Sequence, residues 1–340
     1  MANLDRVAPR QQAIRRFSIA RLLRGGQAYA VLGALIILII YNLVSTPRFL
    51  TLDGLTEAIN VNLLQVAPIA IVATGMTLVI ATGGIDLSVG SIMAIAGATA
   101  PIIFLSTLPP LNNPFIGITL GISVPLLIAG IFGLFNGLLI TTFRIQPIIA
   151  TLVLFIAGRG IAQVISNGNI QVFRGSNFVF LGSGRILNIP VQVILMVIII
   201  VTVAWVVRTT TFGRYLLATG GNEAASRLSG VPTSRVKRTV YIISAMLAGL
   251  AGLIIVAINS SSDANNVGLN GELDAIAAVA VGGTPFTGGQ ASVWGTLLGA
   301  LLIQLIRFTL VTKNIPLPVA QIINAAIILF AVYLQRERKS

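Results

Sequence analysis

The chain has 340 residues, of which 56% are hydrophobic and only 9% are charged, and its mean hydropathy is +0.96. This composition excludes an ordinary soluble domain and indicates a polytopic membrane protein in contact with lipid. Cysteine and histidine are both absent, which excludes disulfides, Cys-ligated metals and histidine-based proton transfer. The formal net charge is +13, but the basic residues lie in predicted loops and termini, a pattern typical of membrane proteins rather than of nucleic acid binding.

The apolar segments predict an all-α fold with about ten transmembrane helices. Before them, the basic residues 1–27 resemble the start of a signal peptide, but no convincing cleavage site follows, so the first apolar segment is interpreted as a retained span. The eighth segment is too short to span a membrane alone. The expected spans cover residues 28–46, 61–81 (with a helix start at 54–60), 88–106, 116–142, 148–166, 190–207, 239–259, 273–283, 291–311 and 317–335, and residues 336–340 form a basic tail.

Two stretches with a similar pattern interrupt long apolar segments. Residues 80–98 read IATGGIDLSVGSIMAIAGA and residues 280–300 read AVGGTPFTGGQASVWGTLLGA, so that Gly83 and Gly84 match Gly282 and Gly283. A broken helix in a membrane is tolerated only where protein or a cavity covers the freed backbone. Matched breaks in two halves favour an internal repeat and a transporter core, and the alternative is close packing of glycine-rich helices. The polar residues expected to cap the helix after the first break are Asp86 and Ser88.

The most basic internal segment is the predicted loop 208–238, which carries six basic residues and one acid, Glu223. Residues 222–229 are expected to form a short helix, which follows Gly220-Gly221 and ends at Gly230. A loop this basic between two spans should face the cytoplasm. There a short exposed helix offers a binding surface to a soluble partner, which we expect to be an ATPase.

The distribution of positive charge also predicts the orientation of the chain. With loop 208–238 inside, 16 of the 22 Lys and Arg residues lie in the cytoplasm, four lie outside and two lie within spans. This asymmetry predicts that both termini are cytoplasmic.

No motif points to an enzyme. The chain lacks a Gly-x-x-x-x-Gly-Lys-Ser/Thr phosphate loop, an HExxH motif and a serine nucleophile elbow. We therefore expect no catalytic residue, no metal site and no cofactor, with ATP bound by a partner subunit. A channel is disfavoured because no strand-like filter or ring of acids stands out. A proton- or sodium-coupled carrier is disfavoured because Asp86, Glu272 and Asp274 fall at segment ends.

Three stretches carry a resemblance to a known family. GGIDLSVGS, ATGGNEAASRLSGV and ELDAIAAVAVGGTPFTGG occur in this order, and the chain resembles the ribose-type bacterial ABC sugar-importer permeases over residues 30–335. DANNVG followed by ELDAIAAV, together with ATGGIDLSVGSIMAIAGATA, is most similar to galactofuranose importer permeases. The resemblance implies that residues 28–335 form one transmembrane permease domain in a bacterial inner membrane.

The resemblance also implies partners. These are a cytoplasmic ABC ATPase, a periplasmic sugar-binding protein and a second permease subunit, which in galactofuranose-type systems is a different, paralogous chain. The loop helix corresponds to the family's coupling helix, so Glu223, Ala224, Ala225, Arg227 and Gly230 would dock in a cleft of the ATPase. In the broader family a glycine follows the glutamate by six positions, whereas Gly230 lies seven after Glu223, so atomic details of docking do not transfer. Transport would follow ATP-driven alternating access, without covalent chemistry.

Sugar hydroxyls need hydrogen-bonding partners, and aromatic faces suit sugar C–H surfaces. The alternatives are that an amide in a span joins two helices and that a phenylalanine faces lipid or the core. Arg159 is costly in a span unless it is paired or hydrated, so it lies beside a cavity or holds the fold together. The candidates for the substrate pathway are Asn60, Asn62, Gln65, Phe135, Asn136, Phe155, Arg159 and Gln163.

Asp263, Asn265 and Asn266 lie in the outer segment after the seventh span. We interpret them as a docking site for the binding protein or as the mouth of the cavity, and the alternative is a solvated turn. Two other functions stay open: an ABC permease for a non-sugar solute, such as a branched amino acid or nucleoside, and a stand-alone secondary carrier or channel.

Overall fold

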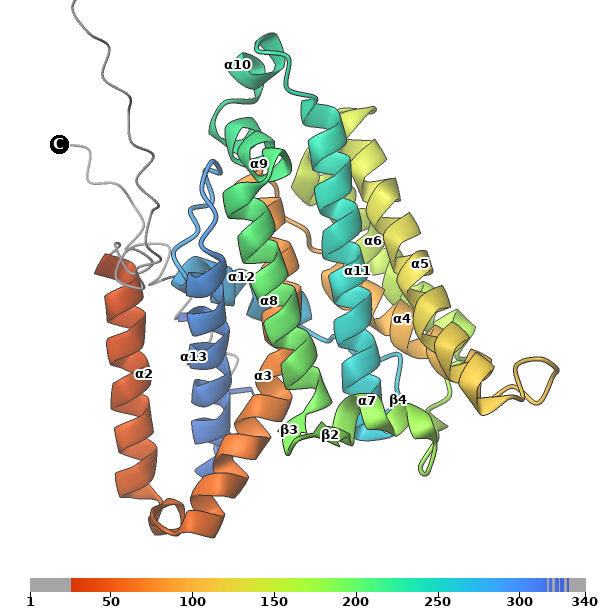
Figure 1. Ribbon diagram of the computed structural model, residues 1–340, viewed down its shortest axis with the longest axis vertical. Coiled ribbons are helices and arrows are strands. Elements are labelled where there is room, and N and C mark those ends of the chain that lie inside the picture. Colours follow the sequence, from red (N-terminus) through yellow and green to blue (C-terminus); the bar gives the residue numbers. More distant parts are fainter. Residues whose placement is uncertain (1–25, 317, 320–321, 324, 327–328, 330–340) are drawn as a thin grey trace, which may run out of the picture.

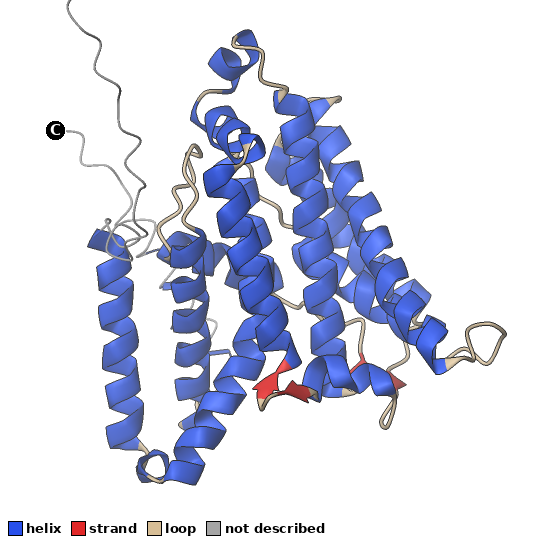
Figure 2. Cartoon of the chain, viewed as in Figure 1, coloured by secondary structure: helices blue, strands red, loops and turns tan. Residues whose placement is uncertain are grey.

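The computed structural model describes residues 26–316 together with 318–319, 322–323, 325–326 and 329. These residues form a bundle of long helices with short strands near one end (Figures 1 and 2). Helix α10 marks the other end, which we call the α10 end. The elements are α2 (Gly26–Ser45), η1 (Pro47–Leu50), α3 (Leu52–Ala81), α4 (Val89–Phe104), α5 (Pro114–Thr141), α6 (Pro147–Ile165), β1 (Gln171–Val172), η2 (Asn177–Val179), α7 (Phe180–Ser183), β2 (Arg185–Ile186), β3 (Ile189–Pro190), α8 (Val191–Thr209), α9 (Thr211–Gly221), α10 (Glu223–Leu228), α11 (Thr233–Asn259), β4 (Ser261–Ser262), α12 (Gly271–Val281) and α13 (Val293–Thr312).

The helices confirm a polytopic helical membrane protein. Within the described residues, α3, α5, α6, α8, α11 and α13 are long and apolar enough to cross a membrane, and α2 and α4 are shorter apolar helices. The described residues of the predicted last span are helical, while the rest of that span and the basic segments 1–25 and 330–340 lie outside the described residues. The expected count of ten spans is therefore not confirmed.

Helix α11 is the centre of the bundle and packs against α3, α4 and α5. From Val66 to Ala81, α3 is buried except for the half-buried Ile69, as expected of a helix that is apolar on all sides. Small residues allow the close contacts: a Cβ at Gly133 of α5 would lie 2.5 Å from the carbonyl oxygen of Tyr241 on α11. Glycine is used in this way where membrane helices pack tightly.

The connection from α3 to α4 passes across α11. Helix α4 packs against α5, α6 and α11, whereas α3 packs against α8, α11, α12 and α13. A Cβ at Gly84 would lie 2.5 Å from the hydroxyl of Tyr241, so the connection lies directly against α11. Helices α12 and α13 form the second pair around an interruption and do pack against each other.

The two interruptions begin with the same backbone turn. Gly83 and Gly283 have φ of +79° and +84°. The next amide donates five residues back in each case, from Gly84 to Val79 and from Thr284 to Val279, both at 3.2 Å. This is the Schellman ending, in which a left-handed glycine closes a helix. The repeat therefore aligns Gly83 with Gly283, one residue away from the alignment that the sequence predicted.

The strands are two-residue pairs away from the α10 end. β1 pairs antiparallel with β4, and β2 pairs antiparallel with β3. Residues 167–188, expected to be a polar loop, therefore contain short strands, η2 and α7. The β1–β4 pair joins this segment to the chain that leaves α11.

The predicted helix start at 54–60 and the span 61–81 form one continuous helix, α3, which tolerates Pro68 in its interior. Two local predictions were wrong. Ser88 occupies the N-cap position of α4 without capping it, because its hydroxyl donates to Asp86 Oδ1 at 2.6 Å. Gly220-Gly221 end an eleven-residue helix, α9, that the sequence analysis treated as loop.

Candidate coupling surface and transport pathway

Helix α10 is a six-residue helix at the tip of the bundle (Figure 1). Asn222 Oδ1 accepts a hydrogen bond from the amide of Ala225 at 2.9 Å, which is an N-cap. At the other end Gly230 has φ of +81°, and the amide of Val231 donates to the carbonyl of Ser226 at 3.0 Å. Because so short a helix is unstable alone, α10 depends on these two caps and on its contacts.

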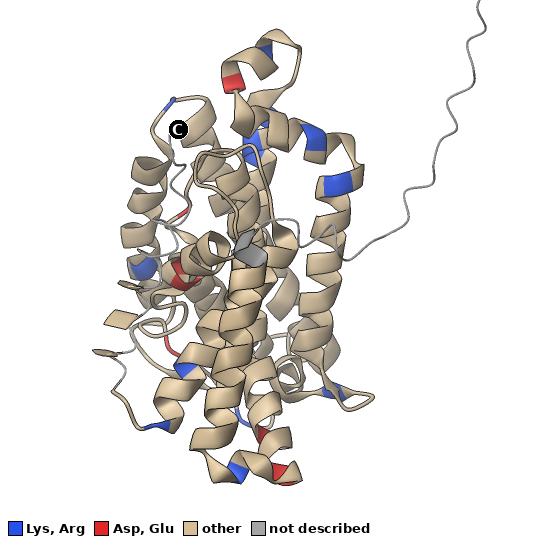
Figure 3. Cartoon of the chain, turned by 90° about the vertical axis from the view of Figure 1, so that its left-hand side faces the viewer, with Lys and Arg blue, Asp and Glu red and all other residues tan. Residues whose placement is uncertain are grey.

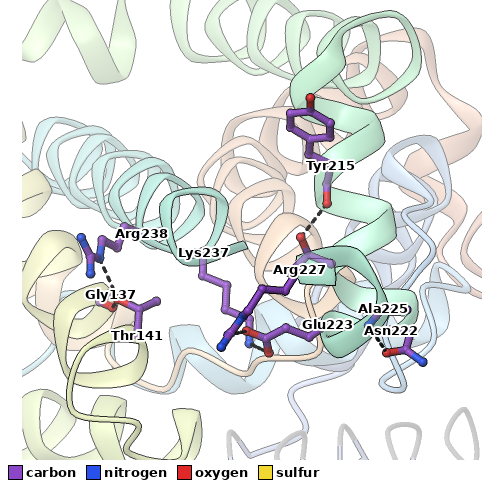
Figure 4. Close-up of polar contacts among 10 residues, drawn as sticks. Gly137, Thr141, Tyr215, Asn222, Glu223, Ala225, Arg227, Lys237 and Arg238 are labelled. Carbon is purple, nitrogen blue, oxygen red and sulfur yellow. Dashed lines mark hydrogen bonds and ion pairs between the residues drawn. The ribbon is translucent and has the colours of Figure 1, made fainter. Parts of the chain in front are cut away.

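Glu223 connects α10 to α11. Its Oε1 pairs with Arg227 Nη2 at 3.1 Å and its Oε2 with Lys237 Nζ at 2.5 Å, whereas Arg238 turns away and donates to Thr141 Oγ1 of α5 at 2.7 Å (Figure 4). Burial acts to raise the pKa of Glu223, but the hydrogen bond and charge of Lys237 and the charge of Arg227 outweigh it. The pKa of Glu223 therefore lies below its ordinary value, and the carboxylate is ionised at neutral pH.

The outward face of α10 is open. Ala224 and Ala225 are exposed, and the Arg227 side chain is 60% exposed. Leu228 is 91% exposed, while Ser226 is buried against the bundle. The sequence analysis did not select Leu228, although its position as the large apolar residue of a short helix was a signal.

A cleft of about 540 Å³ lies beside α10, between the α5–α6 connection and the first turns of α11. Arg144 in this connection has φ of +56°. Three basic side chains and one acidic side chain give the cleft a net positive charge. The lining residues are Ile140, Thr141, Arg144, Ile145, Gln146, Pro147, Glu223, Arg227, Ser234 and Lys237.

Positive charge gathers at the α10 end (Figure 3). The opposite end also carries basic residues, but Arg48 there is paired with Glu57 at 2.7 Å, and Asp53 lies in the first turn of α3. The basic residues on α10, on neighbouring helix ends and on their connections are Arg144, Arg208, Arg214, Arg227, Arg235, Lys237 and Arg238.

Two predicted pathway residues on α6 hold the segment that follows β4. Arg159 Nη1 donates to the carbonyl oxygens of Ala264 and Val267 at 2.9 and 2.6 Å. Gln163 Nε2 donates to Asn265 Oδ1 at 2.7 Å. The guanidinium therefore holds a non-helical backbone segment in place, which was one of the two roles considered for it.

The same segment folds around Asp263, which accepts from the amide of Asn265 at 2.9 Å and from Asn266 Nδ2 at 2.6 Å. Asn266 also lines a cavity of about 200 Å³, together with Asp274 and Arg307, which pair at 2.7 Å. The sequence analysis missed this ion pair, because the two residues lie on different helices.

The predicted pathway residues on α3 lie away from the segment that follows β4. Asn62 donates to the carbonyl of Ala58 at 2.9 Å and lines an apolar groove of about 500 Å³ between α2, α3 and α13. Gln65 accepts from Gln304 of α13 at 2.7 Å, and Asn60 is half-buried on the same helix. Gln65 thus forms a hydrogen bond between two helices.

Asn136 belongs to a buried polar cluster. Its Nδ2 donates to Ser88 Oγ at 2.9 Å, and Ser88 Oγ donates to Asp86 Oδ1. All three side chains are fully buried, so Asn136 joins α5 to the first interruption. Phe135 and Phe155, in contrast, are 43% and 36% exposed on α5 and α6.

Residues 59–332 match the family described as the permease component of the branched-chain amino acid transport system. The chain belongs to this family. The family is one of transport permeases and not of enzymes. This family match and the sugar-permease relatives reported next confirm the resemblance inferred from the three motifs.

Curated relatives match most of the chain. It is 36% identical to the galactofuranose transporter permease protein YtfT of Escherichia coli (strain K12), over 90% of this chain and 88% of the relative. It is 39% identical to the ribose import permease protein RbsC of Haemophilus influenzae, over 93% of this chain and 94% of the relative. Identity to the fructose import permease protein FruF of Bifidobacterium longum is 36%, over 87% and 84%. No solved structure matches the chain significantly.

Proposed function

We propose that this chain is the permease subunit of a bacterial ABC importer in the inner membrane. It moves a monosaccharide, galactofuranose or a ribose-like sugar, from the periplasm to the cytoplasm by alternating access. The observation that carries this proposal is similarity along nearly the whole chain to permeases named for galactofuranose, ribose, fructose and L-arabinose. The family's own description, a branched-chain amino acid system, makes a non-sugar solute the second candidate.

A separate ATPase supplies the energy and binds at α10. Support comes from the exposed Leu228 and Arg227 on a capped helix at the tip of the bundle. The positively charged cleft beside it suits acidic side chains of that subunit. The excess of Lys and Arg here indicates that the α10 end faces the cytoplasm, so both termini lie in the cytoplasm as well.

The remaining partners are a periplasmic binding protein and a second, paralogous permease chain. The segment around Asp263, Asn265 and Asn266 docks the binding protein or forms the mouth of the sugar route. The cavity lined by Asn266, Asp274 and Arg307 supports the second role, because it combines planar polar groups with apolar walls such as Met93. Sugar should bind weakly here. A ligand shifts the equilibrium between the outward-open and inward-open states only through the difference between its affinities for them, and a strong preference for one state would hold the permease in it.

The first experiment is purification of the chain from its native membrane under mild conditions, followed by mass spectrometry. An ATPase and a second permease in the sample support the heteromeric importer, and an ATPase with this permease alone supports a homodimer. Absence of an ATPase would reject coupling through α10 and favour a stand-alone carrier.

A double variant, Glu223→Ala with Arg227→Ala, then tests the coupling surface. It removes the contacts of Glu223 with α11 and a charge on the exposed face of α10. Sugar uptake and sugar-stimulated ATP hydrolysis should fall together in the importer, whereas a lone carrier would be unaffected. Arg185→Ala, an exposed arginine in β2 at the opposite end, is the control and should leave ATP hydrolysis unchanged.

A further inference from the structure

Three glycine-containing segments that lie far apart in the sequence meet at the α10 end. They are the end of α3 with the first interruption (Ala81 to Gly84), the end of α9 at Gly220 and the connection between α12 and α13 (Gly288-Gly289). The amide of Gly289 donates to the carbonyl of Ala81 at 2.9 Å. We call this meeting point the glycine junction.

The contacts at the glycine junction are between backbones. A Cβ at Gly220 would overlap the carbonyl oxygen of Ala81 and lie 2.6 Å from the amide nitrogen of Gly289. A Cβ at Gly288 would lie 2.9 Å from both the carbonyl oxygen of Gly220 and the amide nitrogen of Gly83. Side chains adjust to strain by changing rotamer, but these backbone contacts leave no such freedom.

The glycine junction lies between α10, where we propose that the ATPase binds, and the two interruptions. On one side Gly220 is two residues before Asn222, the N-cap of α10. On the other side are the matched turns at Gly83 and, through the α12–α13 connection, Gly283. Glu223 supplies a separate contact from α10 to α11 through a partly buried pair of charged side chains. The route through Gly220 is therefore the tightly packed one.

We propose that the glycine junction transmits movement of α10 to both interruptions, so that the inner end of α3 and the α12–α13 connection move together. Gly220 is the central positioning residue. The inference rests on the proposed function, because it requires an ATPase that moves α10. Close-packed groups transmit displacement because the protein interior is dense and has low compressibility.

Two neighbouring glycines provide a matched test. Gly220→Ala places a methyl group against the backbone of Ala81, whereas a Cβ at Gly221 meets only the Cα of Gly289 at 4.0 Å. Both residues end the same helix, so their effects on helix propensity are similar. In the reconstituted complex Gly220→Ala should retain the ATPase but import about tenfold less sugar per ATP hydrolysed, as expected for loss of a coupling interaction. Gly221→Ala should stay within about twofold of the unmodified chain.

Equal effects of the two variants, with the ATPase bound in both, would refute the glycine junction and leave the proposed function intact. If the unmodified chain binds no ATPase, both proposals fail. A second measurement covers poor folding of Gly220→Ala: amide hydrogen exchange of the unmodified complex, without nucleotide and with vanadate-trapped ATP. The amide of Gly289 should remain protected in both states, and its free exchange in either state would show that the segments separate.

Discussion

Removal of the Asn222 cap should weaken ATPase binding without unfolding the bundle. Asn222→Ala deletes the hydrogen bond from the amide of Ala225 at 2.9 Å, which stabilises a helix by about 1 kcal/mol. A helix of six residues is marginally stable. If it is ordered half of the time, a loss of about 1 kcal/mol reduces its ordered fraction to about 15%, which weakens apparent affinity about threefold. If the helix is mostly disordered before the substitution, the same loss of about 1 kcal/mol weakens the apparent affinity by about fivefold, which is the upper limit.

The assay for this prediction is titration of the detergent-solubilised permease onto the immobilised ATPase. Asn222→Ser is the matched control, because serine caps helices about as well as asparagine, and its affinity should match that of the unmodified chain. Thermal unfolding of the bundle should be the same for all three proteins, since Asn222 is exposed. Unchanged binding by Asn222→Ala, or equal weakening by both variants, would refute the reasoning.

Three further outcomes are expected. Arg159→Met should remove two hydrogen bonds from a charged donor, each worth about 1.5–3 kcal/mol, so hydrogen exchange after β4 should speed up more than in Arg159→Lys. Arg307→Gln should destabilise the chain by about 3 kcal/mol, because it leaves the buried carboxylate of Asp274 unpaired, and Asp274→Asn should cost less, because Arg307 is only partly buried. Thermal unfolding of the double variant should show less than the sum of the two losses; additive losses would contradict the pairing. The lowered pKa of Glu223 means that its contacts stabilise α10 above the ordinary pKa of about 4.3 and are lost as pH falls through the lowered value. Exchange of α10 amides in Glu223→Gln should therefore exceed that of the unmodified chain at pH 6 and equal it at the lowest pH tolerated; a constant difference would count against the ion pairs.

Local signals in the sequence were enough for the features that depend on neighbouring residues. Hydrophobic length predicted the membrane class, because every spanning helix needs a long apolar segment. Asn222 and Gly230 predicted α10 within one residue at each end, because caps act over three or four positions. The glycines of the two interruptions predicted where α3 and α12 end, since a left-handed residue stops a helix.

Predictions failed where a longer-range contact decides the local structure. Helix α9 was expected to be loop, yet its end packs against Ala81 and Gly289. Ser88 was expected to cap α4, but the buried carboxylate of Asp86 needs a donor and takes its hydroxyl. Leaving a buried carboxylate without a hydrogen-bond donor costs more free energy than leaving the start of a helix without a side-chain cap.

The sequence by itself thus determined the class of protein, its family and the position of the exposed helix α10, because composition, motifs and caps are local properties. Only the tertiary structure decided which residues share a site. Arg159 meets its two carbonyl partners, and Asp274 meets Arg307, across pairs of helices that are not defined by spacing along the chain. The glycine junction depends most on tertiary structure, because it joins three separate segments through backbone contacts, which leave no side-chain signature in the sequence.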